Sequence, residues 1–171
     1  MSSSESFFIT LNPSVHFLGY SVWRNQELFK HGIIKANEND ANVNLEIMFN
    51  QISALMDEYS PSVIAIQTIP MRLKADIVRN NLLLQGMVMA ICVSKHIFVK
   101  ITSLGQWKKD LKIKDKESDL QKVAKKYVVK KYAEKVDGIE AEAICIGLGI
   151  FKSMSNISDV NHQNGQSTTV K

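Results

Sequence analysis

The chain has few cysteines, and this scarcity argues against two kinds of protein. Cys92 and Cys145 are the only cysteines among the 171 residues, and both lie in apolar stretches. No CxxC or CxH spacing is present, so a disulfide framework or a metal pair is the weaker interpretation. We expect both to be reduced thiols in the core.

Long apolar runs and a signal-like pattern at residues 1–6 are also missing. No run of eighteen apolar residues occurs, so we expect no membrane span. Residues 1–6 lack the charged-then-apolar layout of a signal peptide, and we therefore expect an intracellular, cytoplasmic protein. A length of 171 residues with 45% hydrophobic residues predicts one globular domain, and we find no internal repeat.

The net charge is only +4, but it is unevenly distributed. Between Trp107 and Lys135 there are eleven lysines and five acids. A concentrated positive field suits a polyanionic partner, whereas a solvated lysine-rich helix face needs no partner at all. This feature alone leaves both interpretations open.

The apolar periodicity predicts an α/β chain. Three hairpin-linked strands come first, strands then alternate with helices, and two further helices end the chain. The strands are expected at 6–11, 16–24, 28–35, 62–67 and 97–101, and the helices at about 43–59, 74–95, around Trp107, 117–133 and 137–154. This order predicts a mixed sheet with helices on both faces, in a domain at 6–155. Residues 156–171 lack apolar periodicity and are expected to form a disordered tail.

Polar side chains lie at two strand ends and at the start of the last helix. Asn12 ends the first strand and Gln67 ends the fourth. Asp137 and Glu140 lie three residues apart and share one helix face. These four oxygen-bearing side chains can converge at the end of the sheet, where a hard cation such as Mg²⁺ would find oxygen ligands.

Each group also has an ordinary structural interpretation. Asn12 before a proline is a common turn residue, and Gln67 at a strand end is commonly just solvated. Asp137 and Glu140 suit the dipole of a first helical turn without any metal. Glu142, two residues beyond Glu140, is expected to point elsewhere.

In their order and spacing, the motifs resemble the RuvC family of Holliday junction resolvases, within the RNase H-like nuclease superfamily. The resemblance covers about residues 6–152. It rests on Leu11-Asn12-Pro13-Ser14, Gly19-Tyr20-Ser21-Val22, Val63–Gln67 after Pro61, Gln85–Ala90, Trp107-Lys108-Lys109 and Asp137–Ile144. It implies an RNase H-like fold and a crossover junction endodeoxyribonuclease. Such an enzyme cuts four-way DNA junctions in recombination and repair by two-metal phosphodiester hydrolysis.

The resemblance also implies roles for individual residues. The catalytic, metal-binding positions would be Asn12, Gln67, Asp137 and Glu140, with two Mg²⁺ or Mn²⁺ ions per active site. Lys116, or Lys114 if the local alignment slips by one residue, would lie near the scissile phosphate. The implied further DNA contacts are Lys108, Lys109, Lys112, Ile69, Met71 and Arg72. The family works as a homodimer, for which the apolar helix Leu82–Val93 would supply the contact, and the sequence identifies no branch-migration partner.

Two positions depart from the family pattern. Asn12 stands where the family has Asp, and Gln67 where it has Glu. Both changes are isosteric and remove charge that bound metals need, so we expect weak metal binding and little or no cleavage. Deliberate inactivation and natural loss of cleavage both explain the amides. The alternative function is a non-catalytic protein that binds four-way or branched DNA. A weaker alternative is a nuclease of the same superfamily that acts on RNA–DNA hybrids, or a transposase-like fragment.

Overall fold

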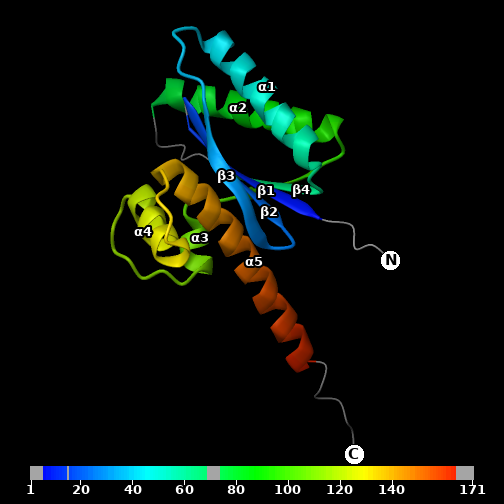
Figure 1. Ribbon diagram of the computed structural model, residues 1–171, viewed down its shortest axis with the longest axis vertical. Coiled ribbons are helices and arrows are strands. Elements are labelled where there is room, and N and C mark those ends of the chain that lie inside the picture. Colours follow the sequence, from blue (N-terminus) through cyan, green and yellow to red (C-terminus); the bar gives the residue numbers. More distant parts are fainter. Residues whose placement is uncertain (1–5, 15, 69–73, 165–171) are drawn as a thin grey trace, which may run out of the picture.

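The computed structural model describes residues 6–14, 16–68 and 74–164, and only the backbone of 156–164. Within these ranges a five-stranded sheet has the strand order β3-β2-β1-β4-β5 (Figure 1). The strands are β1 (Phe7–Pro13), β2 (Phe17–Arg24), β3 (Glu27–Lys35), β4 (Val63–Gln67) and β5 (Phe98–Thr102). The helices are α1 (Ala41–Tyr59), α2 (Ala75–Ser94), α3 (Gln106–Asp110), α4 (Leu120–Tyr132) and α5 (Gly138–Asn164). The predicted mixed α/β fold is confirmed.

The first three strands form the predicted antiparallel meander. Leu11 of β1 pairs with Tyr20 of β2, which pairs in turn with Gly32 of β3. The turn between β2 and β3 is Asn25-Gln26, with φ angles of 51° and 69°. Two successive left-handed residues are typical of the type I′ turn that matches the twist of a tight hairpin.

The remaining strands pair in parallel, and their register determines which side chains share the sheet edge. β1 pairs with β4, and Leu11 lies beside Ile66. The next residue of each strand therefore reaches the same place, at the carboxyl ends of β1 and β4. These residues are Asn12 and Gln67.

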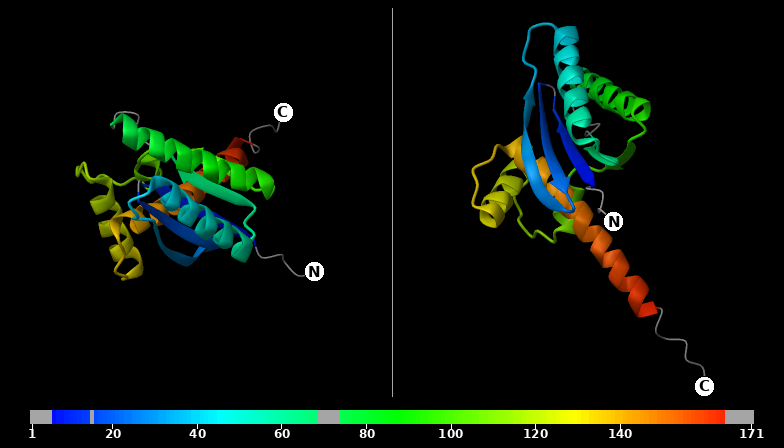
Figure 2. Two further views of the ribbon diagram at one scale, coloured as in Figure 1. Left: turned by 90° about the horizontal axis from the view of Figure 1, so that it is seen from above. Right: turned by 45° about the vertical axis from the view of Figure 1, so that its right-hand side comes forward.

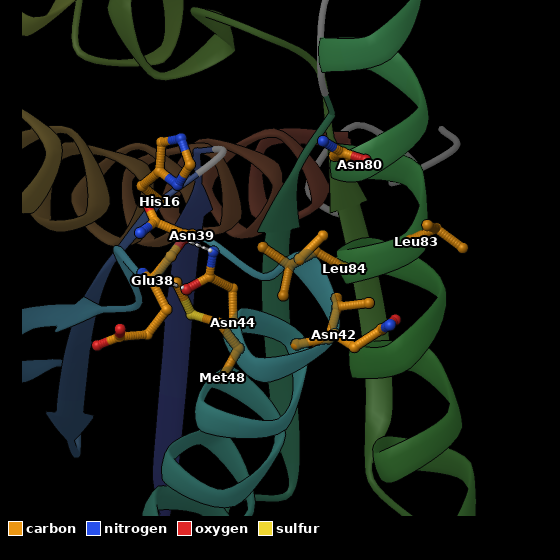
Figure 3. Close-up of a pocket in the computed structure, with 11 residues that line it drawn as sticks. His16, Glu38, Asn39, Asn42, Asn44, Met48, Asn80, Leu83 and Leu84 are labelled. Atoms are coloured by element: carbon orange, nitrogen blue, oxygen red, sulfur yellow. Dashed lines mark hydrogen bonds between the residues drawn. The ribbon is translucent and has the colours of Figure 1, made fainter.

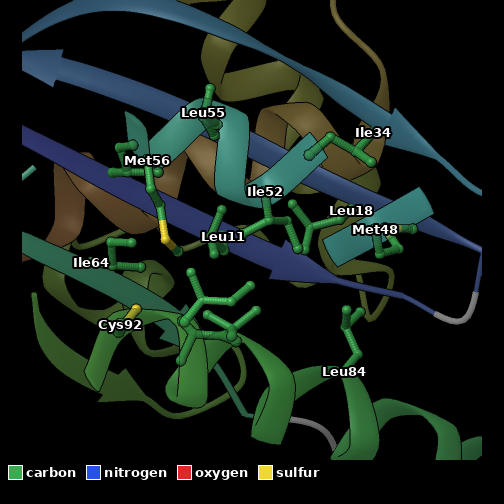
Figure 4. Packing of buried hydrophobic residues seen from close by; sticks show 14 of the residues in the cluster. Leu11, Leu18, Ile34, Met48, Ile52, Leu55, Met56, Ile64, Leu84 and Cys92 are labelled. Atoms are coloured by element: carbon green, nitrogen blue, oxygen red, sulfur yellow. The ribbon is translucent and has the colours of Figure 1, made fainter. Parts of the chain in front are cut away.

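Helices cover both faces of the sheet (Figure 2). On one face, α1 and α2 pack over aliphatic side chains at alternate positions of β1 and β2. Figure 4 shows this core, which includes Ile9, Leu11, Leu18, Val22, Ile52, Ile64, Leu84 and Cys92. On the other face, α3, α4 and α5 pack around Trp23, Trp107, Ile144 and Cys145. Both cysteines are free and buried, as predicted.

The α5 face of the sheet contains a polar patch where α5 crosses β1 and β2. Thr10 Oγ1 hydrogen-bonds Ser21 Oγ, and both hydroxyls reach the carbonyl oxygen of Ala143, at 2.6 and 3.1 Å. Trp23 Nε1 donates to Ser21 Oγ at 2.7 Å. Because strand side chains alternate between faces, Asn12 follows Thr10 onto this same face.

α5 is longer than the sequence predicts. The prediction ends the helix near Met154 and makes 156–171 a disordered tail, but α5 continues to Asn164. The predicted end of the helix was therefore wrong, whereas the division into a domain at 6–155 and a tail at 156–171 stays a prediction. No glycine or proline occurs between Gly149 and Gly165, so each added residue can extend an existing helix by one hydrogen bond without a new nucleation cost.

α2 has two apolar faces, one buried in the core and one exposed. Leu84, Val88 and Ile91 are buried, whereas Leu82 and Val93 are 48% and 73% exposed. Within the described ranges, α2 is the one helix that length and composition would allow to cross a membrane. In its apolar stretch 33% is buried inside the protein. A core helix meets the same criterion, and α2 packs against α1, β1 and β5. The expected absence of a membrane span therefore stays a prediction.

Gly147 allows α5 to pack closely against Trp23. A Cβ at this position would lie 2.4 Å from Nε1 and Cε2 of the buried indole. At Gly86 of α2, by contrast, no heavy atom of the described chain lies within 4 Å of an added Cβ. The two glycines are therefore a matched pair of helical positions with opposite surroundings.

We predict that Gly147→Ala lowers the free energy of unfolding by about 1–3 kcal/mol, because the indole must move. Gly86→Ala should raise it by about 0.5–1 kcal/mol, since alanine favours a helix over glycine. Urea unfolding monitored by circular dichroism measures both. Stabilisation by Gly147→Ala would contradict the tight contact between α5 and Trp23.

Candidate functional site

Two amide side chains meet at the carboxyl ends of β1 and β4. Gln67 Nε2 donates to Asn12 Oδ1 at 3.0 Å. Both residues are buried, with exposed fractions of 3% and 5%. The structure thus brings together the two amides that the sequence singles out, and it does so through the parallel register of the two strands.

Glu142 of α5 is the third member of this cluster. Its Oε2 accepts a hydrogen bond from Asn12 Nδ2 at 3.1 Å, and its Oε1 accepts one from Gln67 Nε2 at 3.1 Å. Trp107 Nε1 of α3 also donates to Oε1, at 3.4 Å. Glu142 is only 4% exposed. We define the polar cluster as Asn12, Gln67, Trp107 and Glu142.

The expectation that Glu142 points away from the site was wrong. A step of two residues turns a helix by about 200°, so Glu142 leaves the face occupied by Glu140. The sequence does not fix how α5 is rotated about its own axis. In the structure this rotation aims Glu142 at Asn12 and Gln67, and it leaves Glu140 outside the cluster.

Asp137 and Glu140 cap the N-terminus of α5. Asp137 Oδ1 accepts from Ile139 N at 3.2 Å, and Glu140 Oε2 accepts from Asp137 N at 3.1 Å. This reciprocal pattern is a capping box. Glu140 Oε1 also hydrogen-bonds His31 Nδ1 of β3 at 2.7 Å.

Neither capping carboxylate hydrogen-bonds Asn12 or Gln67 in the part of the chain that the structure describes. Two of the four predicted ligand side chains therefore meet. Asp137 and Glu140 instead occupy the structural role that the alternative interpretation gives them.

A glycine in β2 lets the first turn of α5 reach the sheet. Gly19 pairs with Asn12, and a Cβ there would lie 2.4 Å from the carbonyl oxygen of Ile139. That carbonyl accepts a hydrogen bond from Asn12 Nδ2 at 3.2 Å. A side chain at position 19 would push α5 outward and separate Glu142 from both amides.

The polar cluster holds a single carboxylate, and no lysine or arginine hydrogen-bonds it among the described residues. Burial raises the pKa of Glu142, while hydrogen bonds from Gln67, Asn12 and Trp107 oppose the increase. The charge is therefore balanced by N–H groups of neutral side chains. The carboxylate oxygens are thus hydrogen-bonded, and the cluster has no further anionic oxygen that could bind a cation.

These residues do not fit a pair of divalent cations. Hard cations need several anionic oxygens, and the one carboxylate here already accepts three hydrogen bonds. The amide nitrogens of Asn12 and Gln67 point at its oxygens, where a cation would have to bind. Elsewhere in the described residues, no group of three or more His, Cys, Asp or Glu could hold a metal ion.

The lysines predicted to contact DNA lie in α3 and in the loop that follows it. Lys108 Nζ donates to the carbonyl of Glu117 at 3.2 Å, so this lysine holds the loop in place. The other four side chains are exposed and make no hydrogen bond within the described chain: Lys109, Lys112, Lys114 and Lys116. They remain accessible to a polyanion.

The lysine-bearing segment begins directly beside the polar cluster. Trp107 of α3 contacts Glu142, and Gly105 N donates to Gln67 Oε1 at 3.4 Å. The other predicted DNA contacts, Ile69, Met71 and Arg72, lie outside the described residues.

Sequence reasoning missed Glu142 and the contact that Trp107 makes with it. A signal for Glu142 was present, because it is the one acid within the small and apolar run from Ala141 to Ile150. A charged group in such a run must either reach solvent or find buried donors. For Trp107, only the tertiary structure shows which acceptor its N–H finds.

Comparison with known proteins connects this arrangement to one family. The family model described as crossover junction endodeoxyribonuclease RuvC matches residues 8–148. No curated protein matches the sequence at a significant level.

Several solved structures share the fold. Thermus thermophilus RuvC in complex with a Holliday junction substrate has a TM-score of 0.71 at 14% identity, over 88% of this chain and 95% of that one. The yeast mitochondrial Holliday junction resolvase Ydc2 gives 0.63 at 12% identity, over 94% and 86%. Fowlpox virus resolvase in complex with Holliday junction DNA gives 0.52 at 11% identity, over 86% and 98%.

The raised pKa of Glu142 predicts how stability depends on pH. The folded state keeps a proton that the unfolded chain loses near the ordinary glutamate value of 4.5. Stability from this group therefore falls as pH rises from that value to the raised pKa. Glu142→Gln cannot titrate, so its stability relative to the parent protein should increase with pH across this window.

Urea unfolding at a series of pH values from 4 upward, on the order of half-unit steps, measures the effect. Glu46→Gln, at an exposed position of α1 outside the polar cluster, is the matched control for the same chemical change. A constant difference between Glu142→Gln and the parent at every pH would contradict a raised pKa.

Proposed function

The chain belongs to the RuvC family of crossover junction endodeoxyribonucleases, the Holliday junction resolvases, and on that basis we propose that it binds four-way DNA junctions with little or no cleavage. The observation that carries this proposal is the polar cluster. Its amides replace acids of the family pattern, and its only carboxylate is already neutralised by N–H donors.

Junction DNA as the partner is supported by the related structures. Thermus thermophilus RuvC and fowlpox virus resolvase, which share the fold, were both solved with Holliday junctions. A junction of this kind presents closely spaced phosphates. The protein would therefore act in an intracellular, DNA-associated location.

The exposed lysines beside the cluster suit the phosphate backbone. We assign Lys116 to the position nearest the phosphate that family members cleave, with Lys114 as the alternative. The proposed secondary phosphate contacts are Lys108, Lys109, Lys112 and Arg72, whereas Ile69 and Met71 would insert apolar side chains at the junction centre. Phosphate contacts position a duplex without reading its sequence, which fits recognition of branched shape.

Loss of cleavage follows from the chemistry of the cluster. RuvC-family resolvases in general depend on divalent metals. Restoring carboxylates at positions 12 and 67 would supply the missing charge for Mg²⁺ or Mn²⁺, two per site. The acid from α5 would be Glu142, which already faces both positions. Asp137 and Glu140, which the sequence predicts, are the alternative ligands.

We predict that Asn12→Asp combined with Gln67→Glu yields a protein that nicks a synthetic four-way junction in Mg²⁺ or Mn²⁺. The parent chain should bind the same junction without nicking it. Denaturing gels of end-labelled strands measure cleavage, and mobility shifts measure binding. If the doubly substituted protein binds the junction as tightly as the parent and still never cuts it, loss of the two acids does not explain the inactivity.

Third substitutions in that cleaving background identify the acid from α5. Glu142→Gln should abolish nicking with junction affinity retained, because it removes the only acid that touches both positions. Glu140→Gln should retain nicking unless the cap is needed to hold α5. The reverse result would favour the ligand set predicted from sequence.

The exposed apolar stripe of α2 supports a homodimer. Leu82, Gly86, Met89 and Val93 follow one another at four-, three- and four-residue steps and so share a face. Three of them are large apolar side chains that stay exposed to 48%, 39% and 73% at Leu82, Met89 and Val93. A second copy of the chain would cover them, and a dimer would present two sites to the two sides of a junction.

We predict that Leu82→Glu weakens dimerisation by at least about tenfold, because a buried unpaired carboxylate costs more than about 1.4 kcal/mol. Sedimentation velocity over a concentration series measures it. Val43→Glu is the matched control, since Val43 is a comparably exposed aliphatic residue on α1, at 41%. A monomeric parent protein would disprove the α2 dimer.

A further inference from the structure

A cavity of about 190 Å³ lies between α1 and α2 and has no role in the function proposed above. Its lining comes from α1 and α2, from the connection between β3 and α1, and from His16 in the connection between β1 and β2 (Figure 3). The residues that matter here are His16, Asn39, Asn42, Met48, Asn80 and Leu84. The cavity is on the α1–α2 face of the sheet, opposite the face that carries Glu142.

The floor of the cavity is apolar and belongs to the core. Met48 and Leu84 are 3% and 4% exposed and belong to the core of the α1–α2 face. Their outer surfaces form part of the cavity lining. An apolar floor of this kind suits the face of a flat ring, which loses little by leaving water.

Three amide side chains around this floor are free to bind a ligand. Asn39, Asn42 and Asn80 make no side-chain hydrogen bond in the described part of the chain. The neighbouring Asn44 differs, because its Oδ1 accepts from Glu38 N at 2.7 Å and its Nδ2 donates to Glu38 O at 2.9 Å. Asn44 therefore shapes the wall, and the other three offer paired donors and acceptors.

The charge of the lining argues against a phosphate. Among the residues that the structure describes, no lysine or arginine lines the cavity. The one acid in the lining is Glu38, whose carboxylate points away from the α2 wall in Figure 3. A neutral, flat ligand with donors and acceptors on its edge matches this lining. Nucleobases have that character, and asparagine amides pair with their edges.

The position of the cavity also connects it to bound DNA. His16 lies in the connection that follows β1, and Asn80 is in the first half of α2, which follows β4. These are the two strands whose carboxyl ends carry Asn12 and Gln67. We propose that the cavity takes one unpaired nucleobase from a bound four-way junction. This proposal rests on the function proposed above.

A base at the crossover of a junction is suited to this site. Such a base stacks on a neighbouring base on one side only, or on neither side, when the junction is open. The cost of unstacking it is therefore smaller than within a continuous duplex. The apolar floor replaces part of the lost stacking, and the three amides replace the lost base-pair hydrogen bonds. Capture of such a base would give the protein a preference for branched over linear DNA without a sequence motif.

The test places 2-aminopurine, whose fluorescence rises when it leaves the base stack, at each crossover position in turn. With the parent protein, at least one position should brighten on binding. The Asn42→Leu, Asn80→Leu double variant keeps side-chain size and net charge and should lose this brightening. Its junction affinity should fall by roughly tenfold, the equivalent of about two hydrogen bonds. Asn50→Leu, exposed on α1 outside the cavity, should behave as the parent protein.

A double-mutant cycle adds a second readout. Replacing the responding base by an abasic residue should weaken binding of the parent protein but not of the double variant, because the same interaction is already lost. Lys116→Ala should lower affinity and keep the brightening at saturation. A junction that binds without any brightening, or additive effects in the cycle, overturns the nucleobase site while junction binding stands. Absence of junction binding by the parent protein overturns both.

Discussion

The buried hydrogen bonds to Glu142 join the central strands of the sheet to the helices on one of its faces. One carboxylate accepts from β1, β4 and α3, while it is itself part of α5. A buried carboxylate is costly unless donors surround it, so these four elements must keep their relative positions. The close approach of Gly19 to α5 and the parallel register of β1 with β4 both serve that requirement. The position of Glu142 therefore depends on all four elements at once.

The chain keeps the frame of its family and changes the chemistry at the frame's centre. The strand ends still converge, and the exposed lysines still follow α3 beside them. At this centre the N–H groups of Asn12, Gln67 and Trp107 surround the Glu142 carboxylate. A surface that attracts DNA can persist under these conditions, because it depends on lysines and shape and not on the cluster.

Much of this arrangement could be predicted from the sequence, and the failures have a common cause. Apolar alternation and the turn at Asn25-Gln26 predict the meander, and strand ends predict that Asn12 meets Gln67. The position of Glu142 could not be predicted, because periodicity shows which residues share a helix face but not which face meets the sheet. That choice depends on a tertiary contact, the approach of Ile139 to Gly19. The length of α5 was missed because polar residues can extend an existing helix without packing.

The hydrogen bonds from Asn12 and Gln67 to Glu142 also limit which substitutions the two amide positions tolerate. Each amide donates to the same carboxylate, so a single change from amide to acid would place two carboxylates side by side without a cation between them. Like charges at that distance repel, and one of them must take up a proton. A chain with one such acid would therefore be less stable than one with both amides. The cluster thus tolerates a second acid only together with a source of positive charge.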